Sequence, residues 1–155
     1  MEQHTSRNVG VEKSMKISSR GEYALRALIY LGKNQNGVKS ISDIAEETLV
    51  TEQYLEQIML QLKGFGYVES RRGIKGGYKL KSPPEKINIG EVVRKIEGPL
   101  APMSCVSVTA YEACPLEESC SLKPLWALIR DNISNLLEQI SLNDLIDGVE
   151  ITVLK

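Results

Sequence analysis

The 155-residue chain contains one histidine, His4, which stands in a polar stretch at its beginning. Histidine is the commonest general acid or base near neutral pH. The sequence also lacks a nucleophile elbow, a phosphate-binding glycine loop and a dinucleotide fingerprint. The paired carboxylates Glu46–Glu47 and Glu117–Glu118 fall on polar faces, with no pattern of a pocket around them. We therefore expect that the protein is not an enzyme.

Long apolar runs are also missing. No segment approaches the roughly 18 consecutive apolar residues of a membrane-spanning helix, and the beginning of the chain lacks the apolar core of a signal peptide. With 42 % hydrophobic and 25 % charged residues, the composition is that of an ordinary soluble protein. We therefore expect a cytoplasmic protein with no membrane partner.

Cysteine is scarce and the net charge is small. An odd number of cysteines, three, argues against a disulfide framework in a cytosolic protein. The net charge of −1 hides an asymmetry, because residues 15–98 hold 14 Lys and Arg against 10 Asp and Glu, whereas residues 99–155 hold 3 against 8. A basic region suits a polyanion, so we expect any nucleic acid to bind within residues 15–98.

Two amphipathic helical patterns, joined by a short connection, lie between residues 41 and 64. Ser42 is expected to cap the first helix and Thr51 the second, because a hydroxyl satisfies unpaired backbone N–H groups. The second pattern has one apolar face and one face rich in glutamine and glutamate. Residues near the start of such a helix reach base edges in a major groove. Those predicted to contact DNA are Thr51, Gln53, Tyr54 and Gln57.

A basic, glycine-rich hairpin follows directly. One strand is expected to begin at Tyr67 and the other to return over 78–80, with the sequence RRGIKGG between them. The glycines permit a tight turn, and Arg71, Arg72 and Lys75 supply charge for phosphate or minor-groove contacts. Alone, this segment is equally typical of a solvated hairpin. After two helices with helix-turn-helix spacing, it favours a winged helix.

The winged helix-turn-helix domain is expected to span residues 15–98, after a flexible tail at 1–14. Its first helix is expected to begin at Ser18 or Ser19, and Arg20 on it is a further candidate for phosphate contact or a solvated side chain. A short apolar pattern from Ile89 ends at Gly98–Pro99 and closes the domain. The fold class expected is mainly α with a small β wing.

A long helix is expected from Leu122 to Ile140. Its apolar residues are spaced 4, 3, 4, 3 and 4, a heptad pattern that favours a homodimer, although packing against its own domain is the alternative. These residues are Leu122, Trp126, Ile129, Ile133, Leu136 and Ile140. Ser141 with Asp144 resembles a capping box for a short final helix. The dimerisation helix and this helix together span 122–147, before a tail at 148–155.

The intervening segment, residues 99–121, has no periodicity and contains all three cysteines. Cys105, Cys114 and Cys120 are separated by eight and five residues, which matches no C-x-x-C motif. Thiolates on one irregular loop can converge on a metal centre. Iron–sulfur clusters normally take four protein ligands, so the loop lacks one. Three unconnected cysteines, one a redox thiol, are the alternative.

Several segments together resemble the IscR/NsrR/CymR family of bacterial transcription regulators. They are MKISSRGEYALRALIYL from Met15, YLEQI from Tyr54, LKGFGYVESRRGIKGGYKL from Leu62, IGEVVRKIEG from Ile89 and the cysteine loop before LKPLW. The resemblance covers about residues 15–145. It implies a homodimer that binds double-stranded DNA, and a 2Fe-2S or 4Fe-4S iron–sulfur cluster on the three cysteines that alters DNA affinity.

The chain departs from the IscR-like pattern at Lys123, where that pattern has a histidine ligand three residues after the third cysteine. In NsrR-like members an acidic residue from the other subunit can complete the cluster, and Glu22 stands at that position. The resemblance therefore implies a repressor that senses redox state, nitric oxide or iron–sulfur status. The alternatives are a cluster-free, CymR-type regulator controlled by a partner protein or thiol oxidation, and a zinc-binding interaction module.

Overall fold

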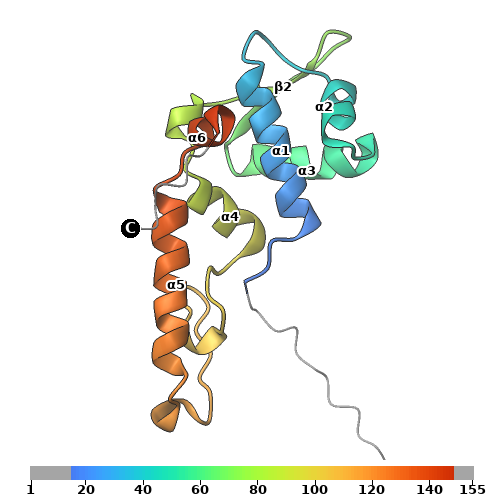
Figure 1. Ribbon diagram of the computed structural model, residues 1–155. Helices are drawn as coiled ribbons and strands as arrows, with labels where there is room; N and C mark the ends of the chain where they lie inside the picture. The colour runs from blue at the N-terminus through green and yellow to red at the C-terminus, as the bar shows by residue number, and fades with distance from the viewer. Residues whose placement is uncertain (1–14, 149–155) are drawn as a thin grey trace, which may run out of the picture.

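The computed structural model describes residues 15–148 (Figure 1). This range is mainly helical with one two-stranded sheet, so the expected fold class is confirmed. Its elements are α1 (Ser19–Lys33), α2 (Ile41–Thr48), α3 (Glu52–Gly64), β1 (Val68–Arg71), β2 (Gly77–Leu80), α4 (Ile89–Glu97), α5 (Lys123–Glu138), α6 (Leu142–Asp147) and the short 3₁₀ helices η1 (Pro84–Lys86), η2 (Ser104–Val106) and η3 (Glu117–Ser119). The tail expected at 1–14 lies outside the described residues, as does the tail expected at 148–155 apart from Gly148. None of the helices in residues 15–148 is long and apolar enough to cross a membrane.

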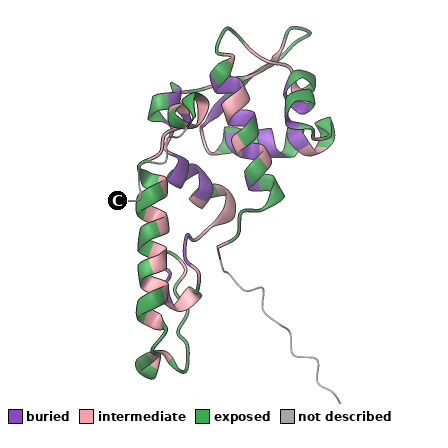
Figure 2. Ribbon diagram, in the orientation of Figure 1, coloured by how far each residue is buried: buried purple, intermediate pink, exposed green. Residues whose placement is uncertain are grey.

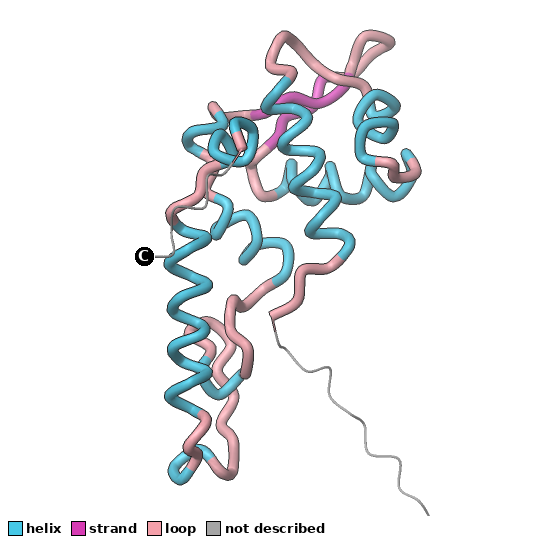
Figure 3. The backbone as a smooth tube through the Cα atoms, viewed as in Figure 1, coloured by secondary structure: helices cyan, strands magenta, loops and turns pink. Residues whose placement is uncertain are grey.

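The molecule has two parts (Figure 1). Helices α1, α2, α3, α4 and α6 and the hairpin form a winged-helix body, and α5 extends from the body as a stalk. The segment between α4 and α5, the cysteine loop (residues 99–121), runs along the stalk and turns back at its far end (Figure 3). Both α4 and η2 pack on α5, so the stalk contacts the body and the loop along one side.

Local caps define the helix-turn-helix. Thr51 caps α3 as predicted, with its hydroxyl accepting from the Tyr54 N–H over 3.4 Å. The prediction that Ser42 caps α2 is wrong, because the helix begins at Ile41 and Ser40 is the cap. Ser40 and Asp43 form a reciprocal capping box, with both hydrogen bonds at 3.1 Å, which places the helix start two residues earlier.

One hydrophobic core holds the body together (Figure 2). The apolar faces of α1 and α3 are almost completely buried, and each buried leucine or isoleucine contributes roughly 1.5–3 kcal/mol to folding. The central side chains are Leu28, Leu31, Ile44, Leu55, Ile58, Met59, Leu62 and Val92. This packing fixes the angle between α2 and α3.

The wing is an antiparallel pair that runs from Val68 opposite Leu80 to Arg71 opposite Gly77. Its second strand begins one residue earlier than predicted. Lys39, in the connection between α1 and α2, exchanges two 2.8 Å backbone hydrogen bonds with Tyr78. A Cβ atom on Gly77 would lie 2.1 Å from the Lys39 carbonyl oxygen, so only glycine permits this close approach.

Helix α6 returns to the body after the stalk. Ser141 and Asp144 form the predicted capping box, and Leu142 is fully buried in the core. The Leu142 N–H donates to the Ile87 carbonyl over 2.8 Å, and Ile146 fills the space that a side chain at Gly32 would need. The range 122–147 therefore spans two packing environments, with α5 in the stalk and α6 in the body.

Candidate nucleic-acid interface and cysteine loop

The first two turns of α3 present a polar face to solvent. Thr51, Gln53 and Gln57 are exposed there, and in a helix-turn-helix these positions meet base edges. Tyr54 differs, because its ring lies edge-on to Tyr23 of α1, with centroids 6.2 Å apart and planes at 89°. Tyr54 is half-buried, so it joins α3 to α1 and offers only part of its surface to a partner.

The wing carries cations that no acidic side chain neutralises. Arg71, Arg72 and Lys75 are exposed, and none forms an ion pair with another residue in the range 15–148. Lys79, in contrast, pairs with Glu69 at 2.9 Å, and its hydrogen bond lowers the pKa of the Glu69 carboxyl. Three unpaired cations on one hairpin form a positive edge that suits phosphate groups.

The wing is fixed relative to α3. The Lys63 ammonium, in the last turn of α3, donates to the Ser70 hydroxyl over 2.6 Å. The last turn of α3 is therefore joined to the hairpin by this hydrogen bond and by the packing of α3 on β1. The structure does not bring Arg20 to the hairpin: Arg20 lies exposed in the first turn of α1, whereas the other end of α1 leads into the strand pairing (Figure 1).

The cysteine loop holds three free thiols. Cys105, in η2, and Cys120 are half-buried, and Cys114 is exposed. In the sequence, Glu117 stands between Cys114 and Cys120, and its side chain is only 16 % exposed and ion-paired with Lys123. This ion pair joins the loop to the start of α5.

The Glu117 carboxylate accepts three hydrogen bonds. The Tyr111 hydroxyl donates to its carboxylate over 2.8 Å and the Cys114 N–H over 3.4 Å, beside the Lys123 ammonium. The Lys123 hydrogen bond, followed by that of Tyr111, lowers the pKa of Glu117, and the same carboxylate raises the pKa of Lys123. Sequence interpretation missed this role, because Tyr111 and Lys123 lie six residues away on either side, a spacing of no regular element.

The donor chemistry of the loop fits an iron–sulfur cluster in its three thiols, which are soft ligands. Lys123, at the position of the histidine ligand in the IscR-like pattern, is ion-paired with Glu117. Glu22 lies on α1, exposed and paired with Arg26 of the same chain. Among residues 15–148, no three His, Cys, Asp or Glu side chains gather into a metal-binding group. The predicted ligands thus lie on the body and the loop and are not assembled within one chain.

Helix α5 leaves apolar side chains uncovered. None of its residues is buried (Figure 2), and Trp126, Ile129 and Ile133 of the predicted stripe are half-buried. The exposed leucines on or beside this stripe are Leu122 (53 %), Leu125 (46 %), Leu128 (59 %) and Leu136 (39 %). Packing within residues 15–148 therefore covers only part of the apolar surface of α5.

Comparison with known proteins gives consistent matches. Residues 17–148 match the family model described as Rrf2, iron-dependent transcriptional regulator. The chain is 36 % identical over 132 residues to the transcriptional regulator CymR of Bacillus subtilis, covering 84 % of this chain and 89 % of CymR. It is 35 % identical over 133 residues to NsrR of Bacillus licheniformis, covering 85 % and 92 %. The solved structure of CymR, the global cysteine regulator of B. subtilis, superposes with a TM-score of 0.73 at 36 % identity, covering 86 % of this chain and 97 % of that one.

Proposed function

The chain belongs to the Rrf2 family of transcriptional regulators, and from this premise we propose that it is a homodimeric repressor whose DNA affinity responds to the state of its cysteine loop. Membership alone makes it a DNA-binding regulator and not an enzyme. The dimer, the contact residues and the signal are the parts that we add.

The observation that carries the proposal is an exposed polar face on α3 together with a wing, packed on the same helix, three of whose cations have no acidic partner among residues 15–148. Gln53 and Gln57 select sequence, because amide side chains pair with adenine edges in the major groove. Arg71, Arg72 and Lys75 bind the phosphate backbone or enter the minor groove. Thr51 and Tyr54 border the same surface, and Arg20 contributes a separate phosphate contact.

Two such surfaces are needed to bind a pair of half-sites, and α5 supplies the dimer interface that holds them together. The exposed leucines of α5 pair with those of a second copy and thereby remove apolar surface from water. The stalk holds two winged-helix bodies at a fixed separation, which sets the spacing of the half-sites.

The cysteine loop is the sensing element. Cys105, Cys114 and Cys120 would hold the iron–sulfur cluster, and Glu22 of the partner subunit would supply an oxygen donor once released from Arg26. When bound, the cluster supplies a centre that reacts with oxidants or small gases such as nitric oxide. The protein's own contribution is to couple the cysteine loop to the stalk, because Cys105 lies in η2, which packs on α5.

A cluster-free regulator of the CymR type is the second candidate. It is favoured by the Glu117–Lys123 pair, which organises the loop without a metal, and by the similarity to CymR. In this case the three free thiols respond by oxidation, or a partner protein binds the loop. A zinc-bound loop is a third arrangement of the same thiols.

The DNA contacts are tested by selecting an operator from random duplexes and titrating it at several salt concentrations. Arg72→Ala/Lys75→Ala should weaken binding to all sequences and reduce the salt slope by about two units, because each phosphate contact contributes about one. Gln53→Ala should instead change the preferred sequence. A Lys33→Ala/Lys86→Ala control removes the same charge from exposed positions elsewhere. Equal effects of the wing and control pairs would disprove the wing assignment.

The sensor is tested by anaerobic reconstitution followed by iron, sulfide and zinc analysis. Wild type should take up iron and sulfide and absorb visible light, and any single Cys→Ala change should abolish the colour. Glu22→Ala should leave a cluster that is bound but more labile. If wild type takes up neither iron nor sulfide, and binds DNA equally before and after treatment, the cluster proposal is wrong; stoichiometric zinc then favours the zinc-bound loop, and its absence favours the CymR-type mechanism.

A further inference from the structure

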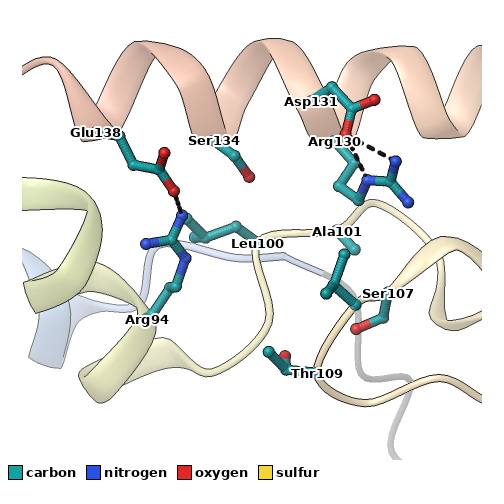
Figure 4. Close-up of a pocket in the computed structure, with 10 residues that line it drawn as sticks. Arg94, Leu100, Ala101, Ser107, Thr109, Arg130, Asp131, Ser134 and Glu138 are labelled. Atoms are coloured by element: carbon teal, nitrogen blue, oxygen red, sulfur yellow. Dashed lines mark hydrogen bonds and ion pairs between the residues drawn. The ribbon is translucent and has the colours of Figure 1, made fainter.

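A cavity of about 320 Å³ lies where the body, the cysteine loop and the stalk meet (Figure 4). Its walls come from α4, from loop residues 100–101 and 107–109, and from α5. Leu100 and Ala101 are buried and form an apolar floor. Pockets of this size are at the small end of those that bind organic ligands, so a nucleotide or an extended peptide is too large.

Two ion pairs face this cavity. Arg94 of α4 pairs with Glu138 of α5, and Arg130 of α5 pairs with its neighbour Asp131 at 2.7 Å. The exposed fractions of these side chains are 33 % for Arg94, 51 % for Glu138, 23 % for Arg130 and 56 % for Asp131. Both carboxylates are more than half exposed, and ion pairs that reach solvent contribute little free energy.

Donor groups remain available after these pairs form. A guanidinium has five N–H donors, and within residues 15–148 Arg94 uses one of them, on Glu138. Arg130 donates to Asp131 and to the Val106 carbonyl, the latter over 2.6 Å. The hydroxyl of Ser134 points from α5 into the space between the ion pairs, with Thr109 across from it (Figure 4).

The balance of charge selects the ligand. Two guanidinium groups and two carboxylates surround the cavity, so a simple anion meets the carboxylates and a simple cation meets the guanidinium groups. A zwitterion avoids both conflicts, because its carboxylate can replace one acidic partner of an arginine while its ammonium satisfies the displaced acid. The apolar floor then accommodates a short aliphatic side chain.

We propose that this cavity binds a small zwitterionic α-amino acid and that the bound ligand adjusts the joint between α4 and α5. The Arg94–Glu138 pair spans this joint, so a ligand that exchanges it changes how the stalk meets the body. Binding itself does not depend on the proposed function. Its effect on DNA affinity does, because it acts through the spacing of the two bodies.

Binding is tested by calorimetry of the full chain with each standard α-amino acid at millimolar concentration. At least one with a short side chain should bind, and both its methyl ester and its N-acetyl derivative should bind roughly tenfold or more weakly, because each loses one charge-assisted contact. Failure of all amino acids to bind, or tighter binding of a simple dicarboxylate, would overturn the proposal.

The site is tested with Arg94→Met, Ser134→Ala and Thr109→Val. Each should weaken binding, most strongly Arg94→Met, whereas Lys95→Met removes the adjacent cation of α4, which pairs with Glu91 and lies outside the cavity, and should leave affinity unchanged. Ser134→Ala and Thr109→Val keep both ion pairs, so they remain informative if Arg94→Met does not fold. Unchanged affinity in all three folded variants would place the ligand elsewhere. Operator titration with and without the amino acid then tests the coupling separately.

Discussion

The Ser18 hydroxyl donates to the Glu97 carboxylate over 2.9 Å, and the Ser18 backbone N–H donates to the same oxygen over 3.0 Å. Ser18 is the cap of α1, and Glu97 is the last residue of α4 before the cysteine loop. The Met15 N–H also donates to the Ala101 carbonyl over 3.0 Å. The start of α1 is thus fastened to the start of the loop, one turn from Glu22.

Gly21 makes this clasp possible, and a double-mutant cycle tests it. A Cβ atom at Gly21 would lie 1.9 Å from the Glu97 carboxylate oxygen, so Gly21→Ala should displace this carboxylate and remove its hydrogen bonds with Ser18, at a cost of about 1 kcal/mol that offsets the better helix propensity of alanine. In a Glu97→Ala background the obstacle is gone, and the same change should be neutral or stabilising, because alanine favours helix by about 1 kcal/mol over glycine. Urea unfolding of the four proteins measures the coupling. Additive effects would mean that the clasp does not constrain Gly21.

The dimer prediction concerns the apolar stripe of α5. Ile133→Glu/Leu136→Glu places two charges in the proposed interface, where burial without a partner is costly, so sedimentation should show monomers and operator affinity should fall by at least about tenfold. Asn135→Glu/Gln139→Glu adds the same charges at exposed polar positions, one on the helix and one at its C-cap, and should remain dimeric. An intact dimer in the Ile133→Glu/Leu136→Glu variant would refute the assignment of α5 as the dimer interface.

The capping box of α6 predicts a pH dependence. Hydrogen bonds from the Ser141 N–H and hydroxyl lower the pKa of Asp144. A lowered pKa in the folded state means that the stabilisation is complete above the unfolded value of about 3.9 and is lost as pH falls through the folded value. Asp144→Asn should therefore lower the urea midpoint at pH 6, and the difference from wild type should shrink toward pH 3. If the difference in urea midpoint between wild type and Asp144→Asn did not change with pH, the ionised Asp144 carboxylate would not be the source of the stabilisation.

Leu49, in the turn between α2 and α3, has left-handed backbone geometry, with φ at 56°, and is 85 % exposed. The conformation costs a non-glycine residue roughly 1–2 kcal/mol, and little packing offsets it. Leu49→Gly should therefore stabilise the protein by roughly 0.5–1 kcal/mol after the extra freedom of the unfolded chain is counted. Leu49→Ala keeps the strain and should change the thermal midpoint little. A lower midpoint for Leu49→Gly would mean that the leucine makes contacts that offset its strain.

Features encoded by neighbouring residues were predictable from sequence. The spacing of apolar residues and the presence of Thr51 or Ser141 before it identify α3 and α6, because capping and amphipathicity act within one or two turns. The prediction of Ser42 as the cap failed because Ser40 and Ser42 both precede the same pattern, and only Ser40 has an acidic partner three residues on, Asp43. The DNA-contacting residues and cluster ligands stay predictions.

Features that join distant parts of the chain were not predictable. The packing of Ile146 against Gly32, the Ser18–Glu97 clasp and the cavity at Arg94 each join residues from separate elements. No local pattern of apolar or charged residues specifies such a pairing. The sequence therefore indicates which helices exist, whereas the three-dimensional packing decides which of them belong to the body.

The burial of Leu142 in the winged-helix core has a consequence for synthesis. The ribosome releases the DNA-contacting helices early, yet the segment that completes their core follows the entire stalk. Contacts between such distant segments form late, because a long loop must close first. The nascent chain therefore cannot finish the body before α5 has emerged, so a completed body always carries the α5 stalk. A chain truncated before α6 should fold poorly and be degraded, and would not compete for operators as a lone monomer.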